Sequence, residues 1–523
     1  MAEPVAASSC EPALLDPALE KLREYARHAA THAPSSEGER ATYGTTVFIA
    51  ETKVPTRFGD FQAYIFQDII HKGYVLTLTY GDVRTASRLH TRMHSSCVTS
   101  ETLRGCDCDC VQQLEGAMKK IAEEGQGVLF YLLQEGRGVG YTAKARDRML
   151  VQASRDTLST FEAYDLLGLR KDYRQYRNVG DIVRILGISA DWVVLTNNPD
   201  KIEAMTRQGM TVARAETLEY EPEPFNLFYL QSKAESGHYL KRPLFSVLQS
   251  VQPPEPVVPF KPRVLPGAER FIYMASYFLP VRPIDNEILL GTDEMRDLFP
   301  DGSIDEYLTQ ADRLVHGFRL LRKHRALLRI DYPRLKRLAE RDPGHRLVSL
   351  LYKPYWFRVH VYYDIVSGHD VVVLTHGQPE SHDVPVVRIQ SESILNRFPV
   401  KVDENKAKYM RAIQHIVDYG VGAIVLVYQD GRGAGFGAFA MDRMMLEQGR
   451  SYSTAESYAK LGVDFDEREY DSIFNVLRAH LPSNKIKMVM NSPNSLVAKG
   501  ELATAIREQQ LDVVDWIFLD REE

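Results

Sequence analysis

Residues 129–150 read LFYLLQEGRGVGYTAKARDRML, and residues 425–446 repeat the pattern as VLVYQDGRGAGFGAFAMDRMML. Each copy opens with an apolar run typical of a buried strand, turns through several glycines and continues in a helical pattern. Further segments recur in the same order, with matching residues always 294 to 296 positions apart. So long a match in one order indicates that the chain holds two copies of one domain.

The segments around the first glycine-rich turn alternate between strand and helix patterns. Residues 46–95 are rich in β-branched and aromatic residues, with Gly and Asp at the breaks, which favours strands. Residues 110–125 form an amphipathic helical pattern that ends at a glycine, and residues 192–199 begin as a buried-type strand. This alternation predicts an α/β (α+β) fold with two tandem copies of a mixed-sheet domain.

The chain is predicted to divide into four parts. Proline is frequent at residues 250–266, which predicts a semi-rigid linker, and residues 305–347 are charged with a helical period. The predicted parts are an N-terminal appendage at 1–45, the first domain copy at 46–242, a proline-rich linker and helical insert at 243–350, and a degenerate second copy at 351–523.

Composition limits the class of protein. The 523 residues are 44% hydrophobic and 26% charged, which suits a globular chain of several domains. The net charge of -6 gives no overall attraction to nucleic acid or to an anionic membrane. The sequence has no signal-peptide pattern and no apolar run of membrane-spanning length. We therefore expect a cytoplasmic protein without nucleic-acid or membrane partners.

Four of the five cysteines lie within fourteen residues, at Cys97, Cys106, Cys108 and Cys110. Such crowding without a secretion signal indicates metal ligation rather than a disulfide framework. Three thiolates from Cys97, Cys108 and Cys110 would leave one position of a tetrahedral zinc open for water, as in catalytic sites. With Cys106 as a fourth ligand the site would instead be closed and structural, so both interpretations stay open.

Three further motifs carry polar chemistry. The glycines of Glu135–Gly140, between a strand and a helix, would let the backbone approach an anion, although many such loops are plain turns. Asp172 and Arg174 are close enough to converge on one ligand, or to form an ordinary surface ion pair. Lys201 follows an apolar strand, where α/β sheets bind ligands; the alternative is a solvated lysine in a turn.

Taken in order, these motifs resemble those of the GTP cyclohydrolase II family. The resemblance covers about residues 46–242 and rests on five segments in the family's order and spacing. They are RMHSSC at Arg92–Cys97, CDCVQQL at Cys108–Leu114, EGRGVG at Glu135–Gly140, DYRQY at Asp172–Tyr176 and LTNNPDK at Leu195–Lys201.

The resemblance implies a zinc-dependent hydrolase of GTP or a related purine nucleotide. Zn²⁺ would lie on Cys97, Cys108 and Cys110, leaving Cys106 as an extra, and a zinc-activated water would open the imidazole ring. Arg174 matches a nucleophile toward the α-phosphorus, with Asp172 as its proton acceptor, and Mg²⁺ would neutralise the phosphates. Positions matching nucleotide-binding residues are Arg92, His94, Ser95, Gln113, Glu135, Gly136, Arg137, Thr160, Thr196 and Lys201.

The expected products are pyrophosphate, formate and a diaminopyrimidine ribosyl phosphate, the entry to riboflavin biosynthesis. Three departures bear on that outcome. Ser96 stands where the family has Glu, and Val111 where it has Gly. The family tyrosine in the helix after the glycine loop is replaced by Arg148 or Met149, which by the resemblance predicts that the formyl group is retained. Alternatively, another hydroxyl such as that of Tyr141 substitutes for it.

The second copy keeps several of these positions but not the thiols. Arg388, Arg432, Thr454, Asp466 and Arg468 match Arg92, Arg137, Thr160, Asp172 and Arg174. Ser393, Met490 and Ser495 replace Cys97, Thr196 and Lys201. Ring opening is therefore not expected in this copy. It is either a scaffold that forms an intrachain pseudo-dimer, with homodimerisation as a further option, or a regulatory nucleotide site.

Two other functions compete with the GTP hydrolase. Ser96 and the missing tyrosine favour a paralogue that acts on another nucleotide in specialised metabolism. A non-catalytic nucleotide sensor with structural zinc is the second alternative, and retention of Asp172 with Arg174 in the thiol-bearing copy argues against it.

Overall fold

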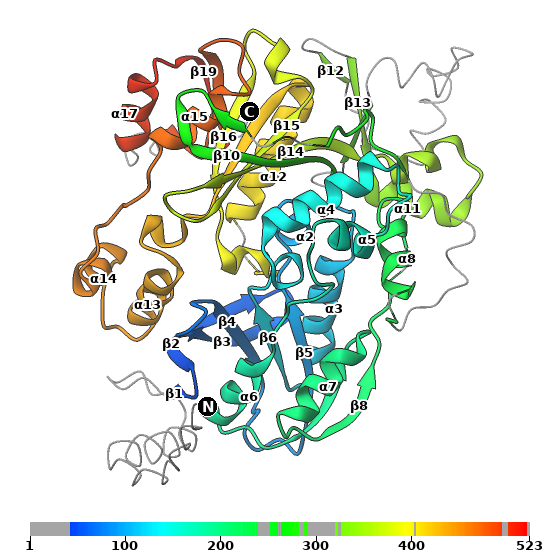
Figure 1. Ribbon diagram of the computed structural model, residues 1–523, viewed down its shortest axis with the longest axis vertical. Coiled ribbons are helices and arrows are strands. Elements are labelled where there is room, and N and C mark those ends of the chain that lie inside the picture. The colour runs from blue at the N-terminus through cyan, green and yellow to red at the C-terminus, as the bar shows by residue number, and fades with distance from the viewer. Residues whose placement is uncertain are drawn as a thin grey trace, which may run out of the picture.

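The computed structural model describes residues 42–220, 222–235, 237–238, 251–259, 261, 263–281, 287–290, 320–322, 326–401, 404–493 and 500–519. These residues form two α/β halves, each built on an eight-stranded mixed sheet (Figure 1). The fold class and the two-copy layout predicted from the repeat are therefore confirmed. Most of the predicted N-terminal appendage lies outside the described residues.

The first sheet has the strand order β1-β2-β3-β4-β6-β5-β7-β8. Strands β5 to β8 pair in parallel where they are neighbours, and the pairs from β1 to β6 along the other side are antiparallel. The strands are β1 Thr42–Tyr43, β2 Thr46–Thr56, β3 Gly59–Asp68, β4 Tyr74–Tyr80, β5 Arg88–Ser95, β6 Gly127–Leu132, β7 Asp191–Leu195 and β8 Val212–Glu216.

Helices connect and cover these strands. Two start at side-chain caps that satisfy free backbone N–H groups: a Ser159–Glu162 capping box opens α5, and Asn198 followed by Pro199 opens α7. The helices are α2 Val98–Glu101, α3 Cys110–Glu123, α4 Tyr141–Ala153, α5 Thr160–Leu166, α6 Arg177–Ile185, α7 Pro199–Arg207 and α8 Leu227–Glu235.

The second sheet repeats the first strand for strand, in the order β9-β10-β14-β15-β17-β16-β18-β19. Its strands are β9 Arg263–Leu265, β10 Ala268–Val281, β14 Tyr355–Asp364, β15 Asp370–His376, β16 Val386–Ser391, β17 Gly422–Val427, β18 Lys485–Met490 and β19 Asp512–Phe518. The helices named with it are α12 Glu404–Tyr419, α13 Phe436–Glu447, α14 Thr454–Leu461, α15 Asp471–Arg478 and α17 Gly500–Glu508.

The two copies differ at one hairpin. In the first half, β2 and β3 pair up to Thr56 and Gly59 across a tight turn. In the second half the matching strands pair up to Val281 and Tyr355, so residues 282–354 are inserted at the hairpin turn. The described part of the insert holds β11 Glu287–Leu290, β12 Leu320–Arg322, β13 Ala326–Asp331 and helix α11 Tyr332–Arg341.

The insertion bears on the predicted domain limits. Residues 243–350 were expected to be linker and helical insert, yet β9 and β10 from this segment belong to the second sheet. The described part of residues 305–347 contains strands as well as a helix. The limits of the four predicted parts otherwise stay a prediction.

The two halves pack reciprocally. Helix α4 of the first half lies on β10 of the second, and α13 of the second lies on β2 of the first. The edges match as well: the Cys106 N–H donates to the Pro280 carbonyl at 2.9 Å, and the Lys401 N–H donates to the Pro55 carbonyl at 2.8 Å. This arrangement is a two-fold-like pairing within one chain. A homodimer stays a prediction.

Within the described residues, no helix is long and apolar enough to cross a bilayer.

Candidate active site

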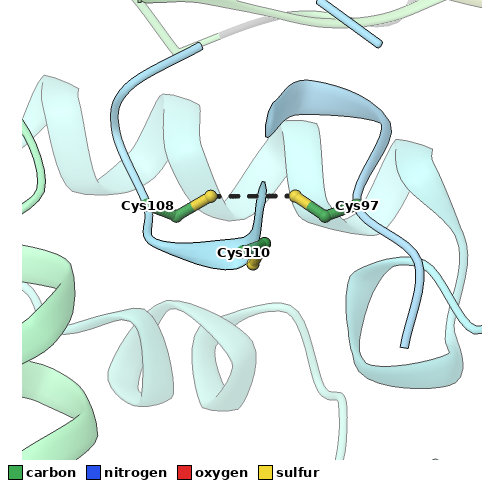
Figure 2. A group of neighbouring side chains, drawn as sticks. All are labelled: Cys97, Cys108 and Cys110. Carbon is green, nitrogen blue, oxygen red and sulfur yellow. Dashed lines mark hydrogen bonds between the residues drawn. The ribbon is translucent and has the colours of Figure 1, made fainter. Parts of the chain in front are cut away.

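The three cysteines predicted as zinc ligands lie together. Cys97 follows β5, and Cys108 and Cys110 flank the start of α3, so the ends of two elements bring the thiols to one point. Their sulfur atoms all lie within 4.8 Å of one another, and Cys97 Sγ is 3.7 Å from Cys108 Sγ. Figure 2 shows Cys97 and Cys108 pointing toward each other, with Cys110 beside them.

This thiol cluster (Cys97, Cys108 and Cys110) fits a tetrahedral zinc. Zn–S bonds of about 2.3 Å place the sulfurs of such a site about 3.8 Å apart, close to the spacing between Cys97 and Cys108. The fourth cysteine does not join them, because the Cys106 thiol donates to the Pro280 carbonyl at 3.1 Å. The geometry therefore favours three protein ligands and one open position over a closed four-cysteine site.

A largely buried lysine faces the thiol cluster. Lys144 Nζ lies 3.1 Å from Cys97 Sγ and 2.7 Å from Glu135 Oε1. Burial opposes the charge of Lys144, but Cys97 and Glu135 outweigh it and raise the pKa of the ammonium well above its ordinary value. Hydrogen bonds from Cys110 and Cys97 hold the pKa of the Cys108 thiol well below its usual range. The surroundings thus favour the thiolate of Cys108, the form that binds metal, whereas hydrogen bonds to Cys108 and Cys97, together with burial, raise the pKa of the Cys110 thiol well above its ordinary value.

A cavity of about 100 Å³ adjoins the cluster; we call it the first pocket. Eight of the predicted site residues line it: Arg92, His94, Ser95, Cys110, Gln113, Arg174, Thr196 and Lys201. The other lining residues are Asp109, Asn197, Asn198, Tyr229, Lys233 and His238. Residues from the ends of β5 and β7, from the start of α3 and from the closing helix α8 therefore meet beside the thiols.

Positive charge is concentrated in the first pocket. Lys201 is 7% exposed and its Nζ donates to the Met93 carbonyl at 2.6 Å. Burial, with Arg92 and Arg174 nearby, holds the pKa of the Lys201 ammonium well below its ordinary value. Burial also lowers the pKa of Arg92. Cations held this close repel one another, and this repulsion destabilises the protein until a bound anion neutralises them. The pocket therefore suits a polyanionic ligand.

The predicted pair Asp172 and Arg174 forms a bidentate contact. Arg174 Nε donates to Asp172 Oδ2 at 2.9 Å, and Nη2 donates to the same carboxylate. Burial opposes the guanidinium charge, but Tyr176 and Asp172 outweigh it and keep the pKa of Arg174 above its ordinary value. Asp172 itself is partly exposed, at 37%, and lies outside the first pocket, so the carboxylate fixes the direction of the arginine.

The glycine loop lies outside the first pocket. Arg137 has φ of 57°, a left-handed conformation that only a constrained loop keeps in a non-glycine residue, and its guanidinium lies 3.9 Å over the Phe161 ring. A Cβ on Gly138 would lie 2.9 Å from the Tyr173 backbone, so the loop needs glycine there. Tyr164 donates to the Gly136 carbonyl at 2.9 Å.

Thr160 is the last of the predicted binding residues. Its hydroxyl is buried and has no hydrogen-bond partner among the described residues. A buried polar group without a hydrogen-bond partner destabilises the protein. This hydroxyl is therefore available to a ligand near the glycine loop.

Sequence reasoning missed a buried polar chain beside the pocket. Glu101 has no exposed surface; its Oε1 lies 2.7 Å from His94 Nε2, and the Tyr131 hydroxyl donates to its other oxygen. Burial, opposed by Glu101, lowers the pKa of the His94 imidazole. No local sequence pattern marks Glu101, because an acidic residue in a turn-like segment is predicted to be exposed to solvent.

Helix α8 closes the first pocket. Lys233 Nζ donates to Asp109 Oδ1 at 2.6 Å, and the Lys233 ammonium lies 4.5 Å over the Tyr229 ring.

The structure also places the residues around the missing tyrosine. Met149 lies in the core, and Arg148 pairs with Asp107 at 3.3 Å while its guanidinium lies 4.9 Å over the Tyr229 ring. The Tyr141 hydroxyl lies 2.7 Å from the Tyr277 hydroxyl inside the interface between the halves. Tyr141 is therefore poorly placed to substitute, whereas Tyr229 lines the pocket.

Comparison with known proteins finds relatives of both halves of the chain. The profile of the family described as GTP cyclohydrolase II matches residues 47–217 and again residues 349–510. Proteins named GTP cyclohydrolase-2 from Shigella boydii serotype 18 and Escherichia coli O9:H4 are each 37% identical to the chain over 195 residues. Each match spans 37% of this chain and 97% of the relative.

These matches place the chain among the hydrolases. It belongs to the GTP cyclohydrolase II family and carries the family's domain twice.

Proposed function

We propose that the first half is a zinc-dependent hydrolase that opens the imidazole ring of GTP and releases pyrophosphate, giving a pyrimidine ribosyl phosphate. The observation that carries this proposal is the meeting of three thiols with a buried cationic pocket. The 37% identity with proteins named GTP cyclohydrolase-2 supports GTP as the substrate.

The residues divide between the metal and the nucleotide. Cys97, Cys108 and Cys110 hold zinc, which supplies the acidity that makes water a nucleophile near neutral pH. Lys144 stabilises the thiolates at 3.1 Å from Cys97 Sγ. Arg92 and the residues lining the first pocket bind the nucleotide, and Mg²⁺ accompanies its phosphates.

Arg174 and Asp172 act at the α-phosphorus. Attack by the Arg174 guanidinium forms an N–P bond, breaks the bond to pyrophosphate and passes a proton to Asp172. Water then cleaves the N–P bond, which leaves the ribosyl phosphate free and returns the proton from Asp172 to Arg174. The carboxylate already accepts from Arg174 Nε at 2.9 Å, so the acceptor is in position. This contact also favours the charged guanidinium, which is a poor nucleophile. Arg174 therefore has to pass its proton to Asp172 during the attack rather than before it.

The fate of the formyl group depends on the environment of Arg148. Arg148 or Met149 stands where the family has a tyrosine, and Arg148 contacts Asp107 and the Tyr229 ring. We propose that hydrolysis stops with the formyl group retained, with Tyr229 as the hydroxyl that competes with this outcome. Mass spectrometry of the products checks it: formate released in equal amount to pyrophosphate contradicts the early stop.

The test of the whole proposal combines metal content with turnover. The purified chain is expected to hold one zinc and to release pyrophosphate from GTP. Zinc without turnover of any nucleotide would favour the nucleotide sensor. Pyrophosphate release from another purine nucleotide, and not from GTP, would favour a paralogue that acts in specialised metabolism. It would count against an enzyme of riboflavin biosynthesis in the cytoplasm. Ser96, buried at the end of β5, and Arg148 are the residues that favour this second candidate.

A further inference from the structure

The copy without thiols contains the larger cavity. A hollow of about 730 Å³, the second pocket, lies at the strand ends of the second sheet, against about 100 Å³ for the first pocket. Its wall combines both halves, because Lys53, Val54 and Pro55 of β2 line it together with residues of the second copy. This volume lies within the range of about 300–1,000 Å³ common for small-molecule sites.

The second pocket retains the nucleotide-binding positions of the family motif. Arg388, Arg432, Thr454 and Arg468 line it. In the first copy, by contrast, the counterparts of Arg432 and Thr454 lie outside the small first pocket.

Local geometry is retained as well. Arg432 has φ of 56°, close to the 57° of Arg137. Each guanidinium lies over a phenylalanine ring, Arg432 at 3.8 Å from Phe465 and Arg137 at 3.9 Å from Phe161, although the two rings come from different positions of the repeat. Arg468 Nε donates to Asp466 Oδ1 at 2.7 Å. A left-handed non-glycine residue costs roughly 1–3 kcal/mol and persists where function or surrounding structure demands it.

The charge of the lining suits a polyanion. Its cationic members are Lys53, Arg388, Lys401, Arg432, Arg443 and Arg468, against the acids Glu392, Asp430 and Asp442. Glu392 is already paired, since Arg397 Nε donates to it at 2.6 Å. The amides of Gln390, Asn396 and Asn491 also line the cavity and offer hydrogen bonds to a base.

The residues needed for ring opening are missing. Ser393 stands where the first copy has Cys97, and no cysteine follows Cys110 in the sequence. Phe439 occupies the position of Lys144, so the cation that stabilises the thiolates has been lost with them. The second pocket can therefore bind a nucleotide without hydrolysing its ring.

Buried side chains connect the two pockets. Glu392, which lines the second pocket, accepts from Arg397, whose Nη1 donates to the Tyr131 hydroxyl at 3.4 Å. Tyr131 donates to Glu101, and Glu101 Oε1 lies 2.7 Å from Nε2 of His94, which lines the first pocket. All five side chains are at least nine-tenths buried, so each depends on its neighbours in this series, and not on water, for its hydrogen bonds.

We propose that the second copy is a regulatory site that binds a nucleoside triphosphate intact, and that the Glu392–Arg397–Tyr131–Glu101–His94 chain transmits its occupancy to the first pocket. Binding at the second pocket does not depend on the proposed function, because it needs no turnover at the thiol cluster. A ligand that changes the position of Glu392 changes the hydrogen bonds of every member of the chain, which is the physical basis of coupling.

Binding is tested by calorimetry on the full chain with GTP and, separately, with inorganic tripolyphosphate. The double variant Arg432→Ala/Arg468→Ala is compared with the matched first-copy variant Arg137→Ala/Arg174→Ala. The second-copy variant is expected to lose one binding event, with at least a tenfold loss of affinity, that the first-copy variant keeps. Charge reversal at the exposed Lys53 and Lys401 (Lys53→Glu/Lys401→Glu) should weaken the same event without risk to the core.

Identical titrations of the wild-type chain and both second-copy variants would overturn the binding site. If tripolyphosphate binds to the second pocket and GTP does not, the inference that the ligand is a nucleoside triphosphate would be overturned. These binding measurements do not depend on pyrophosphate release. Failure of the proposed hydrolase function can therefore be told apart from failure of the regulatory site.

Coupling is tested by hydrogen exchange in the Arg137→Ala/Arg174→Ala background, at a GTP concentration at which calorimetry of this variant shows only the second-pocket binding event. GTP is expected to change exchange in residues 88–103, and Tyr131→Phe, which keeps the ring but removes the hydroxyl, is expected to abolish that change. A GTP-bound second pocket with unchanged exchange in residues 88–103 would overturn the transmission.

Discussion

At the scale of single residues, three thiols and one lysine define the character of the first site. Cys97, Cys108 and Cys110 approach one another closely only because two element ends converge, and Lys144 compensates the negative charge that collects there. The neighbouring Cys106 is tied to the other half instead.

This difference predicts distinct effects of two similar substitutions. Cys108→Ser removes a ligand, so zinc bound to the purified chain should fall from about one equivalent to near zero. Cys106→Ser is the matched control and should retain its metal, because this sulfur faces the Pro280 carbonyl. Atomic spectroscopy of the two dialysed variants measures the outcome, and equal zinc loss in both would contradict the three-ligand site.

Asp147 predicts a pH dependence of stability. Burial, opposed by Arg148, raises the pKa of this carboxyl to about 7. The folded state therefore holds the proton more tightly than the unfolded state, whose pKa is near 4, and the free energy of unfolding should fall as pH rises from about 4 to 7. Above pH 7 the destabilisation is complete.

Asp147→Asn removes that titration. Between pH 5 and pH 8 the wild-type chain should lose on the order of 2 kcal/mol of unfolding free energy that the variant keeps. Urea unfolding at several pH values measures the difference, with Asp60→Asn at an exposed position as the control. Parallel pH profiles for the wild-type and Asp147→Asn chains would show that the carboxyl does not titrate in this window.

At the scale of elements, the glycine loop is the feature that both copies keep. Gly138 and Gly433 have φ of 88° and 95°, and a Cβ would lie 2.9 Å and 2.5 Å from the backbone of the facing strand-like segment. The loop is therefore held by close backbone approach in each half.

Alanine at either glycine should be destabilising. Gly138→Ala and Gly433→Ala are each expected to lower the unfolding free energy by about 1–3 kcal/mol, because the positive φ and the close contact both oppose a side chain. Gly73→Ala, where nothing lies within 4 Å of an added Cβ, is the control. Denaturant unfolding of the three variants compares them, and equal stability of all three would contradict the constraint.

The sequence predicted the elements that carry motifs, and it could not predict those that depend on distant partners. The repeated segment, the mixed sheets and the thiol ligands follow from local patterns. Strand β10 was missed because its hairpin partner β14 lies beyond the insert of residues 282–354, which breaks the local signal. Glu101 and Tyr229 were missed because burial by other elements, rather than their own segment, gives them a role.

At the scale of the whole molecule, the halves share their apolar cores. Ile394, Leu395, Phe398 and Phe436 of the second copy pack among core residues of the first, and the Phe398 ring lies 4.8 Å from the Tyr131 ring. Neither sheet is covered by its own half alone.

Truncation of Phe398 tests this shared core. Phe398→Ala removes a fully buried ring and should lower the unfolding free energy by about 3–5 kcal/mol. Val366→Ala, at a position 72% exposed, should change it by less than about 0.5 kcal/mol. Thermal unfolding of the full chain measures both, and a loss for Phe398→Ala as small as the control would show that the halves are energetically independent.

The reciprocal packing of α4 on β10 and α13 on β2 has a consequence for how the two sites can diverge. In an assembly of identical subunits, every substitution enters both sites at once, and dilution separates the partners. Here the partners are covalently joined, so one site can lose its chemistry while the other keeps it, and their ratio stays one to one at any protein concentration.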